Sequence, residues 1–458
     1  MTLFSAPQID ALPGFVRLQH AELPADFASV STDSRTLPAG ALFVPLKGER
    51  FDGHRFLHEA FARGAGGAVV HEKPSADFGK PVWKVADTLH ALGDLAHAHR
   101  NRFAIPLCGL TGTAGKTTTK EILRAMFAKR SLLVNEGNLN NLIGVPLTLF
   151  GLRPEHAFAV IEMGMNHFGE IERLAQIARP TVGLITNVGP GHLEGVGDLE
   201  GVLRAKTELA REMDPDQTLV LNADDALLRR WGHGAQRKIT WFGLQVGADV
   251  TAHDVADRGL DGSEFTFKAQ GQARRVKLRL PGEHNIRNAL GAAAAALAMG
   301  LPFDEVAAGI EAVAPFRMRG ETLAGPNGST LLSDCYNANP SSMKESLRVL
   351  AGARSRGRIG AVLGDMLELG AHAEPYHREL GEFLAAVAPD RVWVVGTFAP
   401  LVAGSAGKPT VTVQNDRLAL ADEVRAWLRE GDTLLVKGSR GMKLEALVET
   451  LTGARTEH

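Results

Sequence analysis

The sequence predicts an α/β protein of three domains, with a parallel sheet in the middle one. Its 458 residues exceed what one hydrophobic core usually supports, given roughly 100 to 200 residues per domain. From about residue 104, apolar runs alternate with helical patterns, and a second such series begins after Pro315. We expect domain limits at 1–103, 104–314 and 315–458.

The N-terminal domain is expected to be mixed α/β. Strands are predicted at residues 41–46 (ALFVPL) and 67–72 (GAVVHE), with a helix at 55–65 (RFLHEAFARGA) between them. The pattern ends near Asn101, before the next apolar run begins.

The central domain is predicted to contain a parallel sheet with helices on both faces. Four apolar runs read as strands, and the segments between them are long enough for crossover helices: residues 105–110, 157–163, 182–188 and 218–223. Between residues 244 and 282 the pattern changes to short alternating runs, EFTFKA and RRVKLRL, together with the turn-rich DRGLDGS. This change predicts an antiparallel β appendage on the central domain. The alanine-rich stretch at 288–299 then predicts a closely packed helix.

The C-terminal domain is expected to be a smaller, Rossmann-like unit. Its strand candidates, at residues 358–364, 391–396 and 433–438, alternate with helical segments.

Composition narrows the functional classes. With 50 Lys+Arg against 52 Asp+Glu, the net charge of -2 argues against a broad nucleic-acid or membrane surface. Cys108 and Cys335 lack the spacing of a metal site or a secreted disulfide framework, which favours a reducing compartment. The longest apolar stretch is too short for a membrane span, and the N-terminus carries no basic signal-peptide region. We expect a cytoplasmic monomer.

The strongest local motif is LTGTAGKTTTKE at residues 110–121, which follows an apolar strand and opens a helix. Gly112 and Gly115 permit a tight turn, so that backbone N–H groups of the loop can face phosphate oxygens. The other expected loop residues are Thr113, Ala114 and Thr118. Lys116 is expected to neutralise the β and γ phosphates of ATP, and Thr117 to offer its hydroxyl to Mg²⁺. The general motif has glycine where this chain has Leu110.

A phosphate loop alone leaves the reaction open. A GTPase is disfavoured because TLVLNADD has Ala223 where a guanine-reading motif has lysine. A motor, a kinase or a transporter subunit shares the phosphate cradle, so other motifs must decide.

Those motifs resemble the Mur ligase family. The GTAGKT loop resembles the Mur variant, and the segments GNLNNLIGVPLTLF, IEMGMNHFGEI, TNVGPGHLEGVGDLEGVLRAKTEL, GEHNIRNALGAAAA, DCYNANPSSMKESL, GDMLELG and VKGSRGMKLE are similar to successive segments of its D-alanyl-D-alanine-adding (MurF) branch. In the N-terminal domain, STDSRTLPAGALFVPLKGERFDGHRF resembles the uridine-nucleotide-binding domain of the MurE and MurF ligases. The Asp-Asn-Pro-Arg signature of diaminopimelate-adding MurE is absent.

The resemblance implies ATP, two Mg²⁺ ions and a set of catalytic residues that includes Lys116. Thr117 and Glu162, which lies at the end of a predicted strand, are the expected ligands of one metal ion, although a strand-end carboxylate also caps turns. His192 matches the second metal position, whereas a lone histidine is more often structural. Lys206 matches the lysine that the family carbamylates, although Thr207 replaces the usual glycine; a helical lysine is otherwise usually solvated.

Nucleotide contacts are expected from both large domains. The central candidates are Asn138 and Asn141, which also suit turns, and Asn285 and Asn288, of which Asn285 also suits a helix N-cap. Matching positions in the C-terminal domain are Arg319 near the γ phosphate and Asp334 near the ribose. Tyr336, Asn337 and Asn339 match positions around the base, although the YNANP segment by itself also suits a turn.

The N-terminal candidates for the UDP-sugar are Ser34, Arg35, Lys47, Asp52, Gly53 and His54, polar residues that also suit turns and solvated surfaces. The reaction implied is the addition of D-alanyl-D-alanine to UDP-N-acetylmuramoyl-tripeptide through an acyl phosphate, for peptidoglycan synthesis. A sibling such as MurE or folylpolyglutamate synthase, and a nucleotide switch that forms no amide, are the alternatives.

Overall fold

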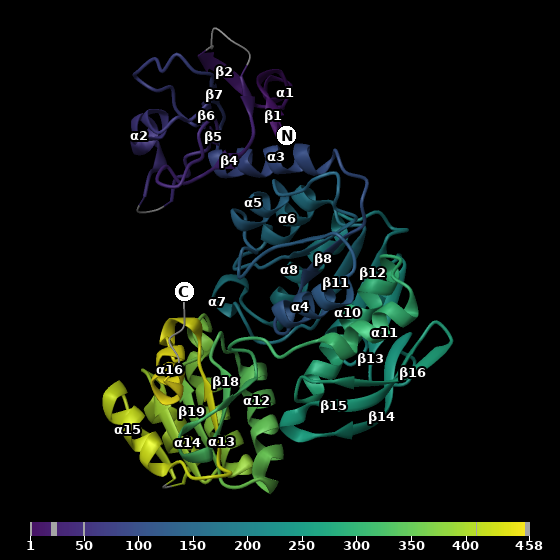
Figure 1. The fold of residues 1–458 in the computed structure, drawn as a ribbon, viewed down its shortest axis with the longest axis vertical. Coiled ribbons are helices and arrows are strands. Elements are labelled where there is room, and N and C mark those ends of the chain that lie inside the picture. The colour runs from purple at the N-terminus through teal and green to yellow at the C-terminus, as the bar shows by residue number, and fades with distance from the viewer. Residues whose placement is uncertain (1, 20–24, 49–50, 409, 454–458) are drawn as a thin grey trace.

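The computed structural model describes residues 2–19, 25–48, 51–408 and 410–453, and it has three α/β domains in the predicted order (Figure 1). The N-terminal domain lies at one end of the long axis, and the central domain connects it to the C-terminal domain. The predicted fold class is confirmed.

The N-terminal domain has a five-stranded mixed sheet in the order β2-β7-β6-β5-β4 and a separate two-stranded sheet. Its strands are β1 (Phe4–Ser5), β2 (Val16–Gln19), β3 (Asp26–Phe27), β4 (Val30–Ser31), β5 (Leu42–Phe43), β6 (Gly67–Val70) and β7 (Val82–Lys84). Its helices are α1 (Ala6–Asp10), η1 (Gly53–Phe56), α2 (Leu57–Ala62) and α3 (Thr88–Arg100). The helix predicted at 55–65 begins as the 3-10 turn η1, because the Asp52 carboxylate accepts the His54 N–H, and it ends before Gly64, whose φ is +95°.

Helix α3 joins the N-terminal domain to the central domain. It packs against α5 and α6 of the central domain, and Arg100 donates to the carbonyls of Ala178 and Ile105 at 2.9 and 3.1 Å. One continuous hydrophobic core includes Trp83 and Leu92 from the N-terminal side and Ile177 from the central side. The two domains are therefore held together by shared apolar packing as well as by hydrogen bonds.

The central domain is built on a nine-stranded sheet in the order β16-β15-β14-β13-β12-β11-β8-β10-β9. Its strands are β8 (Leu107–Thr111), β9 (Leu132–Val134), β10 (Phe158–Glu162), β11 (Val182–Ile185), β12 (Thr218–Asn222), β13 (Ile239–Gly243), β14 (Val250–Asp257), β15 (Ser263–Ala269) and β16 (Gln272–Leu278). Strands β8 to β13 are parallel, and β14 pairs in parallel with β13 before β15 and β16 continue antiparallel. The predicted β appendage is thus an extension of the main sheet rather than a separate unit.

Helices cover both faces of this sheet (Figure 1). They are α4 (Lys116–Met126), α5 (Gly144–Leu149), α6 (Glu170–Ala178), α7 (Leu193–Val196), α8 (Leu199–Arg211), α9 (Ala226–Gly234), α10 (Glu283–Ala298) and α11 (Phe303–Ala312), with the 3-10 turn η2 (Gly259–Asp261). The alanine-rich α10 packs against α4 and the sheet, and a Cβ on Gly291 would come within 3.0 Å of the Phe242 ring. Small side chains on α10 therefore allow the close packing that the sequence predicts.

The C-terminal domain has a six-stranded sheet in the order β17-β18-β22-β19-β20-β21, parallel except for edge strand β17. Its strands are β17 (Glu321–Ala324), β18 (Thr330–Asp334), β19 (Ile359–Gly364), β20 (Arg391–Val395), β21 (Val411–Val413) and β22 (Thr433–Lys437). Its helices are η3 (Pro326–Gly328), α12 (Pro340–Gly352), η4 (Ala353–Ser355), η5 (Gly370–His372), α13 (Ala373–Val387), α14 (Ala399–Ala406), α15 (Arg417–Trp427), η6 (Arg440–Met442) and α16 (Glu445–Thr452). The three strands predicted here are present, and β18, which the apolar pattern did not predict, lies beside β22 in the sheet.

Within the described part of the chain, helices are too short or too polar to span a bilayer. Both cysteines are free and buried, Cys108 in the central sheet and Cys335 after β18. Burial raises the pKa of the Cys108 thiol to about 12 and that of Cys335 to about 11.

We expect both thiols to be unreactive in the folded protein. Because a raised pKa keeps a thiol protonated, a thiol-specific chromogenic reagent at pH 8 should modify neither cysteine in native protein and both in denatured protein. Rapid modification of the native protein would contradict this burial.

Candidate active site

A cavity of about 640 Å³ is lined by residues of both the central and C-terminal domains, at the carboxyl end of the central sheet. Strands β8, β10 and β11 are adjacent and parallel, so the segments that follow them meet at the same edge. The cavity is lined by every predicted nucleotide-contacting residue except Gly112: Thr113, Ala114, Gly115, Lys116, Thr117, Thr118, Asn138, Asn141, Asn285, Asn288, Arg319, Asp334, Tyr336, Asn337 and Asn339. Glu162 and His192 also line it, whereas Lys206 lies behind its wall.

The loop between β8 and α4 is held by its neighbours. A Cβ on Gly112 would lie 1.8 Å from Thr186 Oγ1, and a Cβ on Gly115, which has a φ of +79°, would lie 2.3 Å from Asn288 Oδ1. The Asn187 side chain accepts the Ala114 N–H at 2.9 Å and donates to the Ala114 carbonyl at 3.0 Å. The glycines therefore permit both the close approach and the left-handed turn that the loop requires.

The start of α4 offers a site for an anion. Within the described part of the chain, the backbone N–H groups of Gly115, Lys116 and Thr117 have no hydrogen-bond acceptor. Lys116 Nζ donates back to the Gly112 carbonyl at 2.8 Å, and burial lowers the pKa of this amine. Free N–H groups, a helix N-terminus and a lysine together form a phosphate-binding arrangement.

Glu162 ends β10 beside this loop. Thr117 Oγ1 donates to Glu162 Oε2 at 2.9 Å, and Asn140 Nδ2 donates to Oε1 at 2.8 Å. The side chain is nearly buried, and rather than capping the following turn it faces Thr117. A hydroxyl and a carboxylate oxygen at this separation are a suitable ligand pair for Mg²⁺.

His192 contacts the C-terminal domain. Its Nδ1 lies 3.1 Å from Glu368 Oε2, and both residues have a left-handed backbone, with φ values of 56° and 63°. Burial lowers the pKa of His192, and the histidine holds the pKa of Glu368 below its usual value. The pair links the two sides of the cavity.

Lys206, on α8, is buried rather than solvated. The residue is 1% exposed. Burial, together with the nearby charge of Lys116, holds the pKa of the amine well below its usual value. A buried amine that loses its proton readily is a nucleophile.

Asn285 and Asn288 share one face of α10, as their spacing predicts. Asn288 Nδ2 donates to Asn285 Oδ1 at 3.1 Å, and Asn285 Nδ2 donates to the Pro281 carbonyl at 2.8 Å. The N-cap of α10 is Gly282, so the alternative in which Asn285 caps the helix is wrong.

The C-terminal wall combines aromatic and charged groups. Arg319 lies 4.0 Å from the Tyr336 ring centroid, and Asp334 pairs with the buried Lys437 at 2.6 Å. Asn339 caps α12 by accepting the Ser342 N–H at 2.9 Å. Asn339 is therefore both a helix cap and a residue of the cavity wall.

The six N-terminal candidates lie away from this cavity. Ser34, Arg35, Lys47, Asp52, Gly53 and His54 are all described, and none lines it. Arg35 pairs with Asp33 at 2.7 Å and has a largely exposed side chain. The structure keeps this group within the N-terminal domain, at a distance from the phosphate loop (Figure 1).

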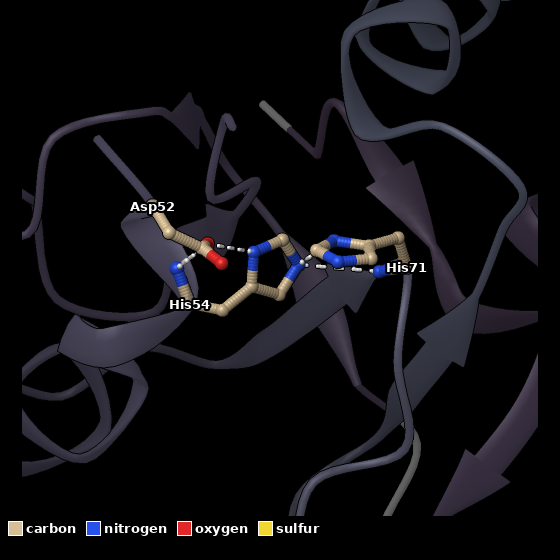
Figure 2. A group of neighbouring side chains, drawn as sticks. All are labelled: Asp52, His54 and His71. Atoms are coloured by element: carbon tan, nitrogen blue, oxygen red, sulfur yellow. Dashed lines mark hydrogen bonds and ion pairs between the residues drawn. The ribbon is translucent and has the colours of Figure 1, made fainter. Parts of the chain in front are cut away.

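Asp52 and His54 form a chain with His71, which follows β6 (Figure 2). His54 Nδ1 lies 2.7 Å from Asp52 Oδ1, and His54 Nε2 receives the backbone N–H of His71 at 3.2 Å and its Nδ1 at 2.8 Å. Because a backbone N–H can only donate, Nε2 of His54 is the acceptor and Nδ1 carries the proton. The cluster is a hydrogen-bonded chain that fixes the loop before η1.

Several residues at the cavity were not singled out from the sequence. They are Asn140, which holds Glu162; Asn187, which holds the loop; Glu368, which faces His192; and Lys437 and Arg440 of the C-terminal wall. Asn140 lies between the predicted Asn138 and Asn141, and only its side-chain contacts distinguish it. Asn141 instead accepts the backbone N–H groups of Ile143 and Gly144 at the start of α5.

Comparison with known proteins supports one family over nearly the whole chain. Three family models match: "Mur ligase family, catalytic domain" at residues 26–100, "Mur ligase middle domain" at 110–296 and "Mur ligase, glutamate ligase domain" at 318–440. UDP-N-acetylmuramoyl-tripeptide–D-alanyl-D-alanine ligase of Escherichia coli is 38% identical, with 95% of each chain covered, and that of Bacillus subtilis is 35% identical, with 92% of each covered.

Solved structures agree. MurF from Acinetobacter baumannii has a TM-score of 0.90 at 32% identity, with 98% of each chain covered. MurF ligase from Thermotoga maritima in complex with ADP has a TM-score of 0.84 at 28% identity, covering 93% of this chain and 97% of that one. With full-length relatives of this similarity and a phosphate loop built as described, the chain belongs to the Mur ligase family.

Proposed function

We propose that this protein is the ATP-dependent ligase that joins D-alanyl-D-alanine to UDP-N-acetylmuramoyl-tripeptide, completing a pentapeptide precursor of peptidoglycan. The observation that carries the proposal is the convergence on one cavity of the phosphate loop, Glu162 and His192 with the C-terminal residues Arg319 and Asp334. Full-length relatives that bear the name of this activity support the same assignment.

The residues fit ATP and Mg²⁺. The unpaired N–H groups at the start of α4 and the Lys116 amine suit the β and γ phosphates. Tyr336 and Asn337, which line the same cavity, are proposed to flank the base. Thr117 and Glu162 are proposed to hold one Mg²⁺, and His192 with Lys206 the second. When bound, these ions would reduce the electrostatic repulsion between the substrate carboxylate and the phosphates.

The chain's own groups then have defined tasks. The tripeptide carboxylate attacks the γ phosphorus, and ADP leaves. The dipeptide amine then attacks the acyl carbon, phosphate leaves, and one N–H proton is released as the amide bond forms. Lys116 stabilises the negative charge that develops on the transferred phosphoryl oxygens. Because the cavity has walls from two domains, their closure excludes water that would hydrolyse the acyl phosphate.

The proposal includes carbamylation of Lys206. The neutral amine attacks CO₂, a C–N bond forms, and a proton is released, so a cation is replaced by an anionic oxygen ligand. The buried position and the lowered pKa both favour the neutral amine that this reaction needs.

The N-terminal group, Ser34, Arg35, Lys47, Asp52, Gly53 and His54, is proposed to hold the UDP-sugar. The Asp52–His54–His71 chain orders one side of this surface, and the exposed Arg35 offers a charge to the diphosphate. We also propose a cytoplasmic location, because the two free thiols suit a reducing compartment. A monomer remains the predicted state.

The direct test is phosphate release from ATP with Mg²⁺, measured with UDP-muramoyl-tripeptide and D-alanyl-D-alanine together and with each alone. Release should require both and should accompany a pentapeptide product mass. Release with the UDP-dipeptide and a diamino acid would favour the MurE sibling, and nucleotide binding without amide formation would favour a switch.

Replacement of Lys206 by alanine should lower kcat by roughly 100-fold, because a metal ligand would be lost. In wild-type protein equilibrated with ¹³CO₂, a carbamate carbon signal should appear by NMR and should be absent from Lys206→Ala. Arg211→Ala, at an exposed position on the same helix, is the control. Full activity of Lys206→Ala would exclude a ligand role.

Replacement of Arg35 by alanine should raise KM for the UDP-tripeptide about tenfold, the cost of one charge-assisted hydrogen bond. KM for ATP should stay unchanged, because Arg35 does not line the nucleotide cavity. Steady-state kinetics with Lys80→Ala, an exposed lysine of the same domain, provide the comparison. An equal effect on both KM values would point to a general structural defect.

A further inference from the structure

Lys120 is a fully buried lysine one turn beyond Lys116 on α4. Its Nζ donates to the carbonyls of Asn135 and Gly137 at 2.8 and 3.1 Å, and it lies 3.5 Å from Glu162 Oε2. It does not line the cavity. A buried ammonium group is costly unless it is paired and hydrogen-bonded, so its partners identify what it stabilises.

Asn135, which follows β9, connects Lys120 to the backbone of Glu162. Its Oδ1 accepts the Glu162 N–H and its Nδ2 donates to the Glu162 carbonyl, both at 2.9 Å, while its own carbonyl accepts from Lys120. The Asn135 side chain thereby continues the pairing of β9 with β10 by one residue. The main chain of Glu162 is fixed through this bridge.

The carboxylate itself is held from three sides. Asn140 donates to Oε1 at 2.8 Å, Thr117 donates to Oε2 at 2.9 Å, and the Lys120 charge faces Oε2. Asn135, Gly137 and Asn140 belong to the loop that follows β9, and the hydrogen bonds of Lys120 join that loop to α4. Each oxygen thus has its own hydrogen-bond donor, which sets the orientation of the carboxylate plane.

We propose that Lys120 and Asn140 are positioning residues that hold the Glu162 carboxylate in the orientation required for Mg²⁺. The inference rests on the proposed function, in which Glu162 is a metal ligand. Lys120 acts through the loop that carries Asn140 and through its charge, and it does not line the nucleotide cavity. Groups that orient a metal ligand in this way typically change metal affinity or activity about 10- to 100-fold when removed.

The test is a calorimetric titration of Mg²⁺ into protein saturated with ADP, comparing wild type with Lys120→Met, which keeps the length and removes the charge and donors. Mg²⁺ affinity should fall about 10- to 100-fold, whereas ADP affinity without Mg²⁺ should change less than about twofold. Lys129→Met, at an exposed position just beyond α4, should match wild type. Unchanged or tighter Mg²⁺ binding in folded Lys120→Met would overturn the proposal.

Asn140→Ala provides a second measurement, which tests the proposal even if the Lys120→Met variant does not fold. This substitution removes the hydrogen-bond donor to Glu162 Oε1. It should weaken the binding of Mg²⁺ by at least about tenfold and leave KM for the UDP-tripeptide unchanged. Unchanged Mg²⁺ affinity in this variant would also overturn the proposal. If wild-type protein itself showed no Mg²⁺-dependent nucleotide binding, the proposed function, rather than the positioning role, would be wrong.

Discussion

The close approach of neighbouring side chains to the glycine backbone of the phosphate loop is the constraint on which the rest of the site depends. Gly112 lies against Thr186 at the end of β11, and Gly115 lies against Asn288 on α10, in both cases too close for a side chain. The loop is thus bounded by an adjacent strand and by helix α10, which lies far along the chain. The alanine-rich face of α10 is what lets that helix come so near.

Much of the fold was predictable because its signals are local. The apolar runs of β8, β10 and β12 and the glycines of the phosphate loop can be recognised within short windows, and they predicted both the parallel sheet and the place of the nucleotide. Lys120 and Asn135 could not be recognised in this way. One is a lysine on an otherwise amphipathic helix and the other an asparagine in a turn, and only tertiary contacts show that both are buried.

The predicted site residues divide along the same line. Lys116, Thr117 and Glu162 meet as strand order requires, because β8 and β10 are neighbours. The contact between His192 and Glu368 depends instead on the relative orientation of two domains. Sequence patterns within either domain do not predict that orientation. Charged pairs such as this one, and Arg356 with Asp261, line the boundary between the central and C-terminal domains. A polar boundary can separate with little exposure of apolar surface.

The shared hydrophobic core beneath α3 has a mechanical consequence. Trp83 and Ile177 belong to one core that crosses from the N-terminal to the central domain, whereas the cores of the C-terminal domain are nearly all its own. Rotation of the N-terminal domain relative to the central domain would expose apolar side chains to water. Rotation of the C-terminal domain would mainly replace ion pairs by contacts with water. The packing therefore opposes displacement of the N-terminal domain more than displacement of the C-terminal domain, which the chain enters between α11, ending at Ala312, and β17, beginning at Glu321.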